Sequence, residues 1–231
     1  MKWGVLVFPG TNREQDAVDV LERLFQQNVR RVWHTERDLS DLDAIMLPGG
    51  FSYGDYLRCG AIARFSPVMD ELVRFAGSGR TVFGVCNGFQ ILTEAGLLPG
   101  TLLRNTSLRF INAHQPLRIE RTDTRFTRLA EMHQVITVPI AHNEGNYFLP
   151  PDGLKRLEDR GGVLFRYCTA MGEVTSAGNP NGSVNNIAGV VNEAGNVLGM
   201  MPHPENTCDP VIGGTDGRVL FESMIGELVA V

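Results

Sequence analysis

The sequence lacks several features that would place it in other classes of protein. Lys and Arg total 21 against 26 Asp and Glu, a formal net charge of -5, and no basic block stands out, so nucleic acid is not expected as a partner. No apolar run approaches the roughly 18 residues that a membrane span needs. The opening segment MKWGVLVFPG is too short in its apolar part for a signal peptide and runs straight into a strand-like segment. We therefore expect neither a nucleic-acid nor a membrane protein.

Cysteine is scarce and shows no paired spacing. The four residues Cys59, Cys86, Cys168 and Cys208 form no C-x-x-C motif. This argues against a zinc site and against a disulfide framework, and it suits a reducing compartment. We expect a cytoplasmic chain with no metal and no cofactor of its own.

Strand-like and helix-like segments alternate through the first hundred residues. Buried strands are expected at 2–8, 29–34, 44–48 and 81–85, and helices at 13–27, 60–76 and 87–96, with Pro67 a kink or break in the second helix. This alternation predicts an α/β fold: a mostly parallel, twisted sheet with helices on both faces. Ligands of such sheets bind at the carboxyl ends of the strands.

The second half of the chain reads differently. Extended segments are expected at 102–111, 115–121 and 134–142, a short helix or turn at 151–161, a hairpin within 187–205 that turns at Gly195, and a helix at 216–230. These features predict a small antiparallel elaboration. No linker or internal repeat interrupts the chain, so we expect one domain over residues 1–231.

The stretch GVCNGFQ at 84–90 places a thiol between two glycines where a strand becomes a helix. Gly84-Val85-Cys86-Asn87-Gly88 has the form of a nucleophile elbow, in which small neighbours let a sharp turn close. A helix that begins at Asn87 would aim its amides at the sulfur and favour the thiolate. The Asn87 amide would also suit an oxyanion hole. The alternative is a buried cysteine at a strand end.

A cysteine nucleophile needs a base, and the base needs an orienting group. Of five histidines, His203 stands in MPHPE, where Pro204 favours an extended backbone that points His203 and Glu205 to one side. The alternative is a stiff polar loop. A second oxyanion donor is expected from LPGGFSYGD at 47–55, either Gly50 or Phe51, although a plain glycine turn remains open.

These motifs together resemble the class I, triad-type glutamine amidotransferases, which have a flavodoxin-like fold. FPGTN, LPGGFSYGDYLRCGAIARF, GVCNGFQIL, AHNEGNY, NPNGS and MPHPE narrow the resemblance to the glutaminase subunit, subunit I, of phosphoribosylformylglycinamidine synthase, over nearly the whole chain. The resemblance implies that Cys86 attacks the glutamine amide, that His203 is base and acid, and that Glu205 orients it. It implies an oxyanion hole of Gly50 and Asn87, and glutamine contacts by Gln90, Phe51, Ser52 and Tyr53.

Two positions depart from the family pattern. Asn143 stands where AHNEG usually has glycine, and Asn206 follows HPE where arginine is usual. Roles for His142 and Glu144 are therefore less secure, and a polar turn or a partner contact is the alternative. Asn143 tolerates positive φ, so the backbone there could be unchanged.

The resemblance also implies partners. The ammonia would pass to a synthetase subunit that uses ATP, with Mg, and formylglycinamide ribonucleotide, and a third small subunit is common in the family. This chain has no G-x-x-x-x-G-K-[ST] loop of its own. Two alternatives stay open: a scaffold subunit with a vestigial triad, and another amide hydrolase of the same fold.

Overall fold

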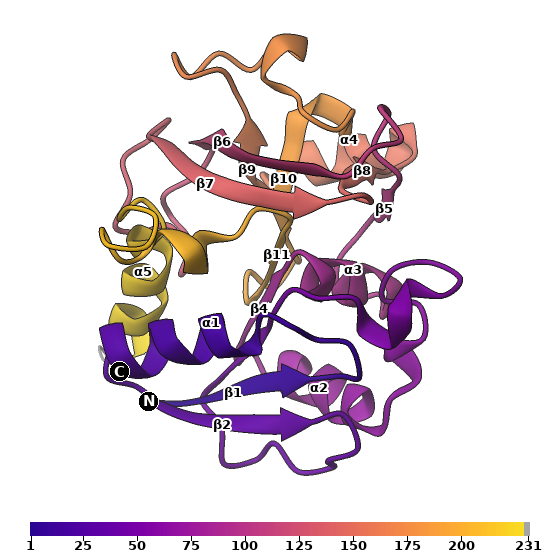
Figure 1. Ribbon diagram of the computed structural model, residues 1–231, viewed down its shortest axis with the longest axis vertical. Coiled ribbons are helices and arrows are strands. Elements are labelled where there is room, and N and C mark those ends of the chain that lie inside the picture. Colours follow the sequence, from indigo (N-terminus) through magenta and orange to yellow (C-terminus); the bar gives the residue numbers. More distant parts are fainter. Residues whose placement is uncertain (229–231) are drawn as a thin grey trace.

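A nine-stranded sheet runs through residues 1–228, the part of the chain that the computed structural model describes (Figure 1). Its order is β2-β1-β3-β4-β11-β10-β9-β6-β7. The strands are β1 Lys2–Val7, β2 Asn28–Trp33, β3 Ala44–Leu47, β4 Thr81–Val85, β6 Ile111–Ile119, β7 Val135–His142, β9 Val163–Tyr167, β10 Ile187–Val191 and β11 Val197–Met200. Pairs from β2 to β11 are parallel, and pairs from β11 to β7 are antiparallel. The short strands β5 Thr101–Leu103 and β8 Asn146–Phe148 pair separately.

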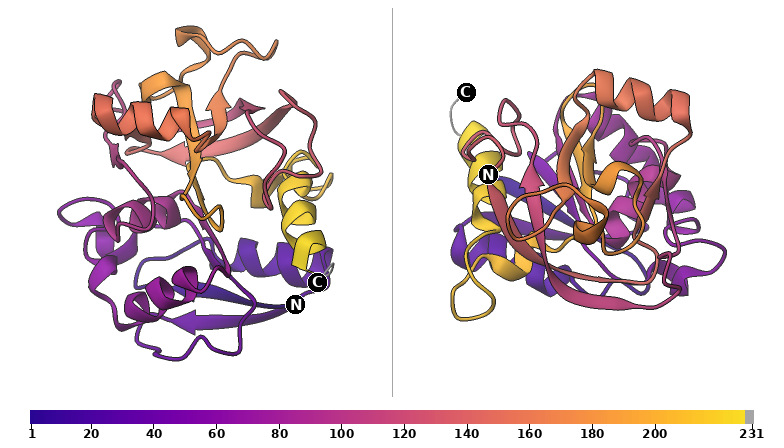
Figure 2. Two further views of the ribbon diagram at one scale, coloured as in Figure 1. Left: turned by 180° about the vertical axis from the view of Figure 1, so that it is seen from behind. Right: turned by 90° about the horizontal axis from the view of Figure 1, so that it is seen from above.

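Helices cover both faces of the parallel half. They are α1 Glu14–Asp19, continued by a π-helical turn Val20–Leu24, α2 Pro67–Gly77, α3 Asn87–Glu94 and α5 Arg218–Leu228. Seen from above, α1 and α5 lie on one side of the strands, and α2 and α3 lie on the other (Figure 2). The predicted α/β architecture is confirmed. The antiparallel part is an extension of the same sheet.

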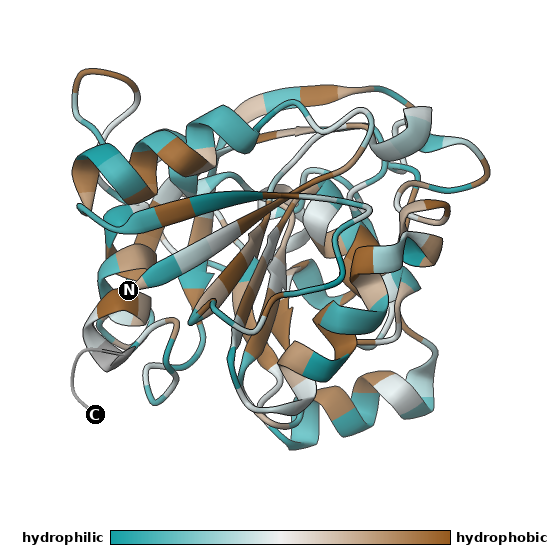
Figure 3. Cartoon of the chain, turned by 90° about the horizontal axis from the view of Figure 1, so that it is seen from below, coloured by the Kyte–Doolittle hydropathy of each residue, from teal (hydrophilic) through white to brown (hydrophobic). Residues whose placement is uncertain are grey.

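Burial explains the strand-like runs of the sequence. Every residue of β3 and β4 is buried, as expected for parallel strands covered on both faces. The ribbons of the central strands are largely brown, whereas helix ribbons alternate between brown and teal (Figure 3). The strands therefore carry continuous apolar runs, and the helices present one apolar face.

The helix predicted over 60–76 is wrong in its first turns. The structure has a short 3₁₀ turn at Ala63–Phe65, and α2 begins at Pro67. Proline has no N–H and fixes φ, so it suits the first position of a helix and not its interior. The preceding segment packs on α3: a Cβ on Gly60 would lie 2.7 Å from the Ile91 nitrogen.

The predictions for the second half are mostly confirmed. The hairpin β10–β11 turns at Gly195 with φ of 73°, and α4, Pro151–Asp159, is the expected short helix. The extended segment predicted at 102–111 is wrong, because only β5 and the first residue of β6 are strand there. β9 was not predicted; its segment VLFRY carries Arg166 among apolar residues and ends just before Cys168. Of the carboxyl-terminal helix, residues 229–231 lie outside the described part.

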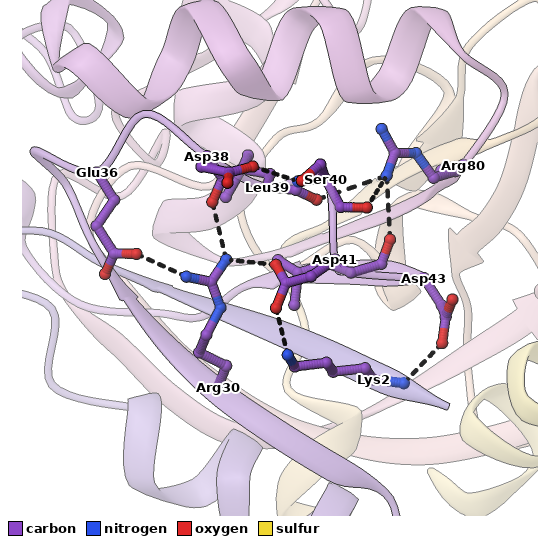
Figure 4. A network of polar contacts seen from close by, with 10 residues as sticks. Lys2, Arg30, Glu36, Asp38, Leu39, Ser40, Asp41, Asp43 and Arg80 are labelled. Carbon is purple, nitrogen blue, oxygen red and sulfur yellow. Dashed lines mark hydrogen bonds and ion pairs between the residues drawn. The ribbon is translucent and has the colours of Figure 1, made fainter.

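Polar contacts tie down the loop that leads from β2 to β3 (Figure 4). Arg30 donates to Glu36 Oε2 at 2.7 Å, to Asp41 Oδ1 at 3.0 Å and to the Asp38 carbonyl at 2.9 Å. Arg80 donates to the Leu42 carbonyl at 3.1 Å. This network lies where β1 and β3 begin. The candidate site lies at the opposite end of the strands, where β1, β3 and β4 end.

Candidate active site

Cys86 forms a sharp corner between β4 and α3. Its backbone has φ of 52° and ψ of -108°, which costs a non-glycine residue about 1–3 kcal/mol. A Cβ on Gly84 would come within 2.8 Å of the Gly88 backbone, and one on Gly88 would come within 2.0 Å of the Leu47 carbonyl oxygen. The two glycines therefore let the corner close and let α3 approach β3.

Two backbone amides converge near the Cys86 corner. Phe51 donates its N–H to the Gly10 carbonyl at 2.9 Å, so it is not available. Gly50 has φ of +152°, and a Cβ there would lie 2.7 Å from Thr11 Cα. Within residues 1–228 its N–H donates to no backbone carbonyl. Asn87 is the first residue of α3, where an N–H has no intrahelical acceptor. Of the two predicted donors on the LPGG loop, the geometry favours Gly50.

His203 and Glu205 form a buried pair after β11. Their Nδ1 and Oε1 atoms are 2.6 Å apart, and the side chains are 4% and 0% exposed. A Cβ on Gly49 would lie 2.8 Å from His203 Cε1 and 3.5 Å from Cys86 Cβ, so the ring and the cysteine meet over this glycine. Among the described residues, His203 Nε2 is buried with no hydrogen-bond partner. With Glu205 holding Nδ1, Nε2 is the nitrogen left for Cys86.

The environment of His203 favours its charged form. Burial alone would lower its pKa, but the Glu205 carboxylate and then the Cys86 sulfur oppose burial and raise the pKa to about 10. The Glu205 carboxylate and the Cys86 sulfur together therefore favour a proton on the buried His203 ring.

Two cavities meet at Cys86 and share Gly50, Phe51, Cys86 and Ala141. The first cavity, which we name the acidic cavity, is also lined by Asp55, Cys59, Gln90, His142, Asn143 and Glu144. The second, which we name the basic cavity, is also lined by Asn12, Arg13, Phe110 and His203. The thiol is thus reached from a negatively charged side and from a positively charged side.

Asn87 and Gln90 join the site to neighbouring loops. Asn87 Nδ2 donates to Gln90 Oε1 at 2.9 Å, and Gln90 Nε2 donates to the Glu144 carbonyl at 2.7 Å. Asn87 Oδ1 accepts from the Ser52 N–H at 3.1 Å. Gln90 therefore lines the acidic cavity, while its amide group holds the loop at 143–145.

Of the three glutamine contacts predicted on the loop that follows LPGG, only Phe51 lines the cavities at Cys86. Phe51 lines both cavities and is 49% exposed. Ser52 is buried, and its hydroxyl has no partner among the described residues. The Tyr53 hydroxyl lies 2.9 Å from His34 Nδ1 and 2.8 Å from Ser66 Oγ. Neither Ser52 nor Tyr53 lines a cavity that reaches Cys86.

His142 is buried beneath the loop that carries Glu144. Its Nδ1 lies 3.1 Å from Asn105 Oδ1, and burial, followed by the charge of His203, lowers its pKa to about 4. A neutral ring that supports the Gly145 backbone fits these contacts. Asn143 does not have positive φ. At the second departure, Asn206 Nδ2 donates to Asp16 Oδ2 at 3.2 Å.

Two residues of the acidic cavity were not among the site residues predicted from the sequence. Asp55 and Cys59 both come from the block FSYGDYLRCG, and both line the cavity beside Cys86. Asp55 Oδ1 accepts a hydrogen bond from Asn87 Nδ2 at 3.3 Å. The block itself was the clue, but a loop with positive φ at Tyr53, Asp55 and Leu57 shows no periodicity from which side-chain directions could be read.

The described residues contain no cluster of three or more His, Cys, Asp or Glu side chains that could hold a metal ion. No helix in residues 1–228 is both long and apolar enough to cross a bilayer.

Comparison with known proteins identifies the class and then the family. The model of the CobB/CobQ-like glutamine amidotransferase domain matches residues 1–215, so the chain is a glutamine amidotransferase. Phosphoribosylformylglycinamidine synthase subunit PurQ of Acaryochloris marina is 56% identical over 230 residues, covering 100% of this chain and 98% of the relative. The same subunit of Salinibacter ruber is 55% identical over 227 residues, covering 98% and 97%. The chain belongs to this PurQ family.

A solved structure supports the same assignment. A chain in the structure of PurLQS from Thermotoga maritima superposes with a TM-score of 0.88 at 41% identity, covering 98% of each chain. The likeness therefore spans the elements that carry the site as well as the sheet.

Proposed function

We propose that this chain is the glutaminase subunit of a phosphoribosylformylglycinamidine synthase, with Cys86 as nucleophile, His203 as acid and base, and Glu205 as its orienter. The observation that carries the proposal is the convergence of the Cys86 corner, the buried His203–Glu205 pair and the Gly50 amide at the ends of β3, β4 and β11. Carboxyl ends of adjacent strands are the expected place for such chemistry.

The geometry suits a thioester mechanism. The Cys86 thiolate attacks the side-chain amide carbon of glutamine, and the negative oxygen that forms is held by the N–H groups of Gly50 and Asn87. Collapse of this intermediate breaks the carbon–nitrogen bond, and His203 gives its proton to the leaving ammonia. His203 then takes a proton from water, which attacks the thioester and releases glutamate and the Cys86 thiolate.

The ammonia would be used by a second protein. The similar solved structure from Thermotoga maritima is that of PurLQS, and we propose an equivalent complex here. Its synthetase subunit would bind ATP and Mg and convert formylglycinamide ribonucleotide to formylglycinamidine ribonucleotide, with a third small subunit present. A single amidotransferase domain acting in the cytoplasm fits the continuous sheet and the free cysteines.

The decisive experiment separates the two half-reactions. Cys86→Ala is introduced into the complex with the synthetase subunit, and product formation is measured with glutamine and, separately, with an ammonium salt. Glutamine-driven activity should fall by about 10,000-fold or more because the nucleophile is gone. Ammonium-driven activity should persist. Cys168→Ala, at a buried thiol outside both cavities, is the matched control.

The outcomes distinguish the alternatives. Persistence of both activities would show that Cys86 is not the nucleophile. Loss of both in an assembled complex would contradict the division of labour between subunits. A scaffold with a vestigial triad predicts no glutamine-driven activity in the unmodified complex, and another amide hydrolase predicts turnover of amides that the synthetase does not use.

A further inference from the structure

We propose that Asp55 and Glu144 together bind the α-ammonium group of glutamine while Cys86 receives the side-chain amide in the same cavity. The inference rests on the proposed function, and it assigns the residues that distinguish free glutamine, which has an α-ammonium group, from other amides. Neither the family likeness nor the triad assigns this part of the substrate.

Asp55 and Glu144 come from separate loops, and both loops are held against the same helix, one through a side chain and the other through its main chain. Asp55 accepts a hydrogen bond from Asn87 Nδ2 at 3.3 Å. The main chain of Glu144 accepts one from Gln90 Nε2 at 2.7 Å. Asn87 and Gln90 follow Cys86 in the first turn of α3. The carboxylates therefore lie beside the nucleophile in the acidic cavity, and glutamine has only two methylene groups between its amide carbon and its α-carbon.

The protein balances the negative charges of the cavity only in part. Burial, and then the charge of Glu144, act to raise the pKa of Asp55 against the hydrogen bonds that it accepts. Burial and the nearby Asp55 carboxylate raise the pKa of Cys59, which therefore stays a neutral thiol between the two acids. Arg104 comes only to 3.9 Å from Glu144, and its side chain is 66% exposed. A substrate cation would relieve the repulsion between the carboxylates.

The other side of Cys86 excludes the reverse orientation. The basic cavity is lined by Arg13 and by His203, whose pKa is raised. An ammonium group placed there would be repelled by both. Glutamine consequently enters with its α-ammonium group on the Asp55 side, and its amide nitrogen faces His203, the proton donor for leaving ammonia.

The test compares glutamine with its analogue that lacks the α-amino group, 5-amino-5-oxopentanoate. In the unmodified complex, kcat/KM for glutamine should exceed that for the analogue by about 100-fold or more, because the analogue leaves the carboxylates without their cation. In Asp55→Asn and in Glu144→Gln, kcat/KM for glutamine should fall by about 10- to 100-fold, as for a lost charge-assisted hydrogen bond. The value for the analogue should stay constant or rise, so the ratio should collapse.

The substitutions are chosen to keep the structure. Asparagine at 55 retains an oxygen for Asn87 Nδ2, and glutamine at 144 retains the carbonyl that accepts from Gln90. Glu131→Gln, at an exposed carboxylate outside the acidic cavity, removes the same charge and should leave the ratio unchanged.

The outcomes of this comparison test the inference and the proposed function separately. Equal losses for both compounds would show that the acids only support the loop and would overturn the inference, as would an unmodified complex that converts both compounds equally well. Absence of all glutamine turnover in the unmodified complex would instead overturn the proposed function, so the two failures are distinguishable.

Discussion

At the scale of single residues, we expect Glu205 to act on the reaction only through His203. Its Oε1 lies 2.6 Å from His203 Nδ1, and no other described side chain is placed to hold the ring. Glu205→Gln keeps a side chain of the same shape but loses the charge and donates where it should accept. The glutamine-driven rate should fall by about 1,000- to 10,000-fold, as when the acid of a triad is neutralised.

The readout for this substitution is the pH profile of kcat/KM together with the rate. The wild-type profile should show an ionisation that moves in Glu205→Gln, because the carboxylate helps to raise the pKa of His203. Substitution of Asp209 by asparagine, at an acid of the same segment that does not touch the ring, is the control. An unmoved profile with a normal rate would show that Glu205 does not orient His203.

The same pair predicts a pH dependence of stability. The pKa of His203 is about 10 in the folded chain, above the ordinary histidine pKa of 6.5 that applies to the unfolded chain. The folded state therefore binds the proton more tightly, and the stabilisation is complete below pH 6.5 and is lost as the pH rises towards 10. The free energy of unfolding from urea titrations should show wild type losing more stability than Glu205→Gln between pH 6 and 9.5. Parallel losses would contradict this.

At the scale of residues, most of the candidate site could be predicted from the sequence. Cys86, His203 and Glu205 were predictable because elbow glycines and a proline-flanked histidine have local steric signatures. Asp55 and Cys59 were not, because their directions depend on a loop with left-handed backbone at three non-glycine positions. The hydrogen bonds of the Tyr53 hydroxyl with His34 and Ser66 could not be predicted either, because they depend on long-range packing.

At the scale of secondary-structure elements, the contact between α3 and β3 sets the position of the nucleophile. A Cβ on Gly88 would lie 2.0 Å from the Leu47 carbonyl, and backbone atoms cannot move aside as a flexible side chain can. Gly88→Ala should lower the free energy of unfolding by about 2–4 kcal/mol or displace α3, by analogy with other overpacking changes. Glutamine-driven activity should fall with it.

A second glycine provides the matched control. Gly77 ends α2, its φ is not positive, and nothing lies within 4 Å of a Cβ built there. Gly77→Ala should leave the stability unchanged or raise it by about 0.4–1 kcal/mol, because alanine restricts the unfolded chain. Urea unfolding of both variants is the measurement, and equal effects would show that the contact with Leu47 does not matter.

Elements were predictable where their periodicity was uninterrupted. β1, β3 and β4 carry buried runs that the sequence displays directly. The helix predicted from residue 60 in fact starts at Pro67, because the segment before it is shaped by Gly60 pressing on α3 and not by its own apolar spacing. β9 was missed because the five-residue segment VLFRY, apolar apart from Arg166, does not by itself tell a strand from a buried helical turn.

At the scale of the whole molecule, a loop with much exposed apolar surface rims the acidic cavity. Tyr56, Leu57 and Phe65 are 74%, 89% and 75% exposed, in the same segment as Asp55 and Cys59. A glutaminase that worked alone would waste glutamine. We expect the isolated chain to turn glutamine over slowly, and the synthetase subunit to cover this loop and raise the rate by about 5- to 150-fold, the range of typical couplings between sites.

Hydrogen exchange and kinetics together test this expectation. Amides of residues 51–65 should exchange more slowly in the complex than in the isolated chain, while those of the Figure 4 network, at the opposite edge, should not change. High glutamine turnover by the isolated chain, or protection confined to other segments, would contradict the prediction.

The meeting of two cavities at one sulfur has a consequence for the order of events. If glutamine binds as proposed above, the glutamyl chain of the thioester should still fill the acidic cavity, while the basic cavity beside His203 should be clear. Ammonia would then leave, and water would arrive, through the basic cavity, and the acyl group would not need to move between the two steps. A small amine such as hydroxylamine should also enter through the basic cavity and convert the acyl-enzyme to the glutamyl hydroxamate. It should not compete with glutamine, which occupies the acidic cavity.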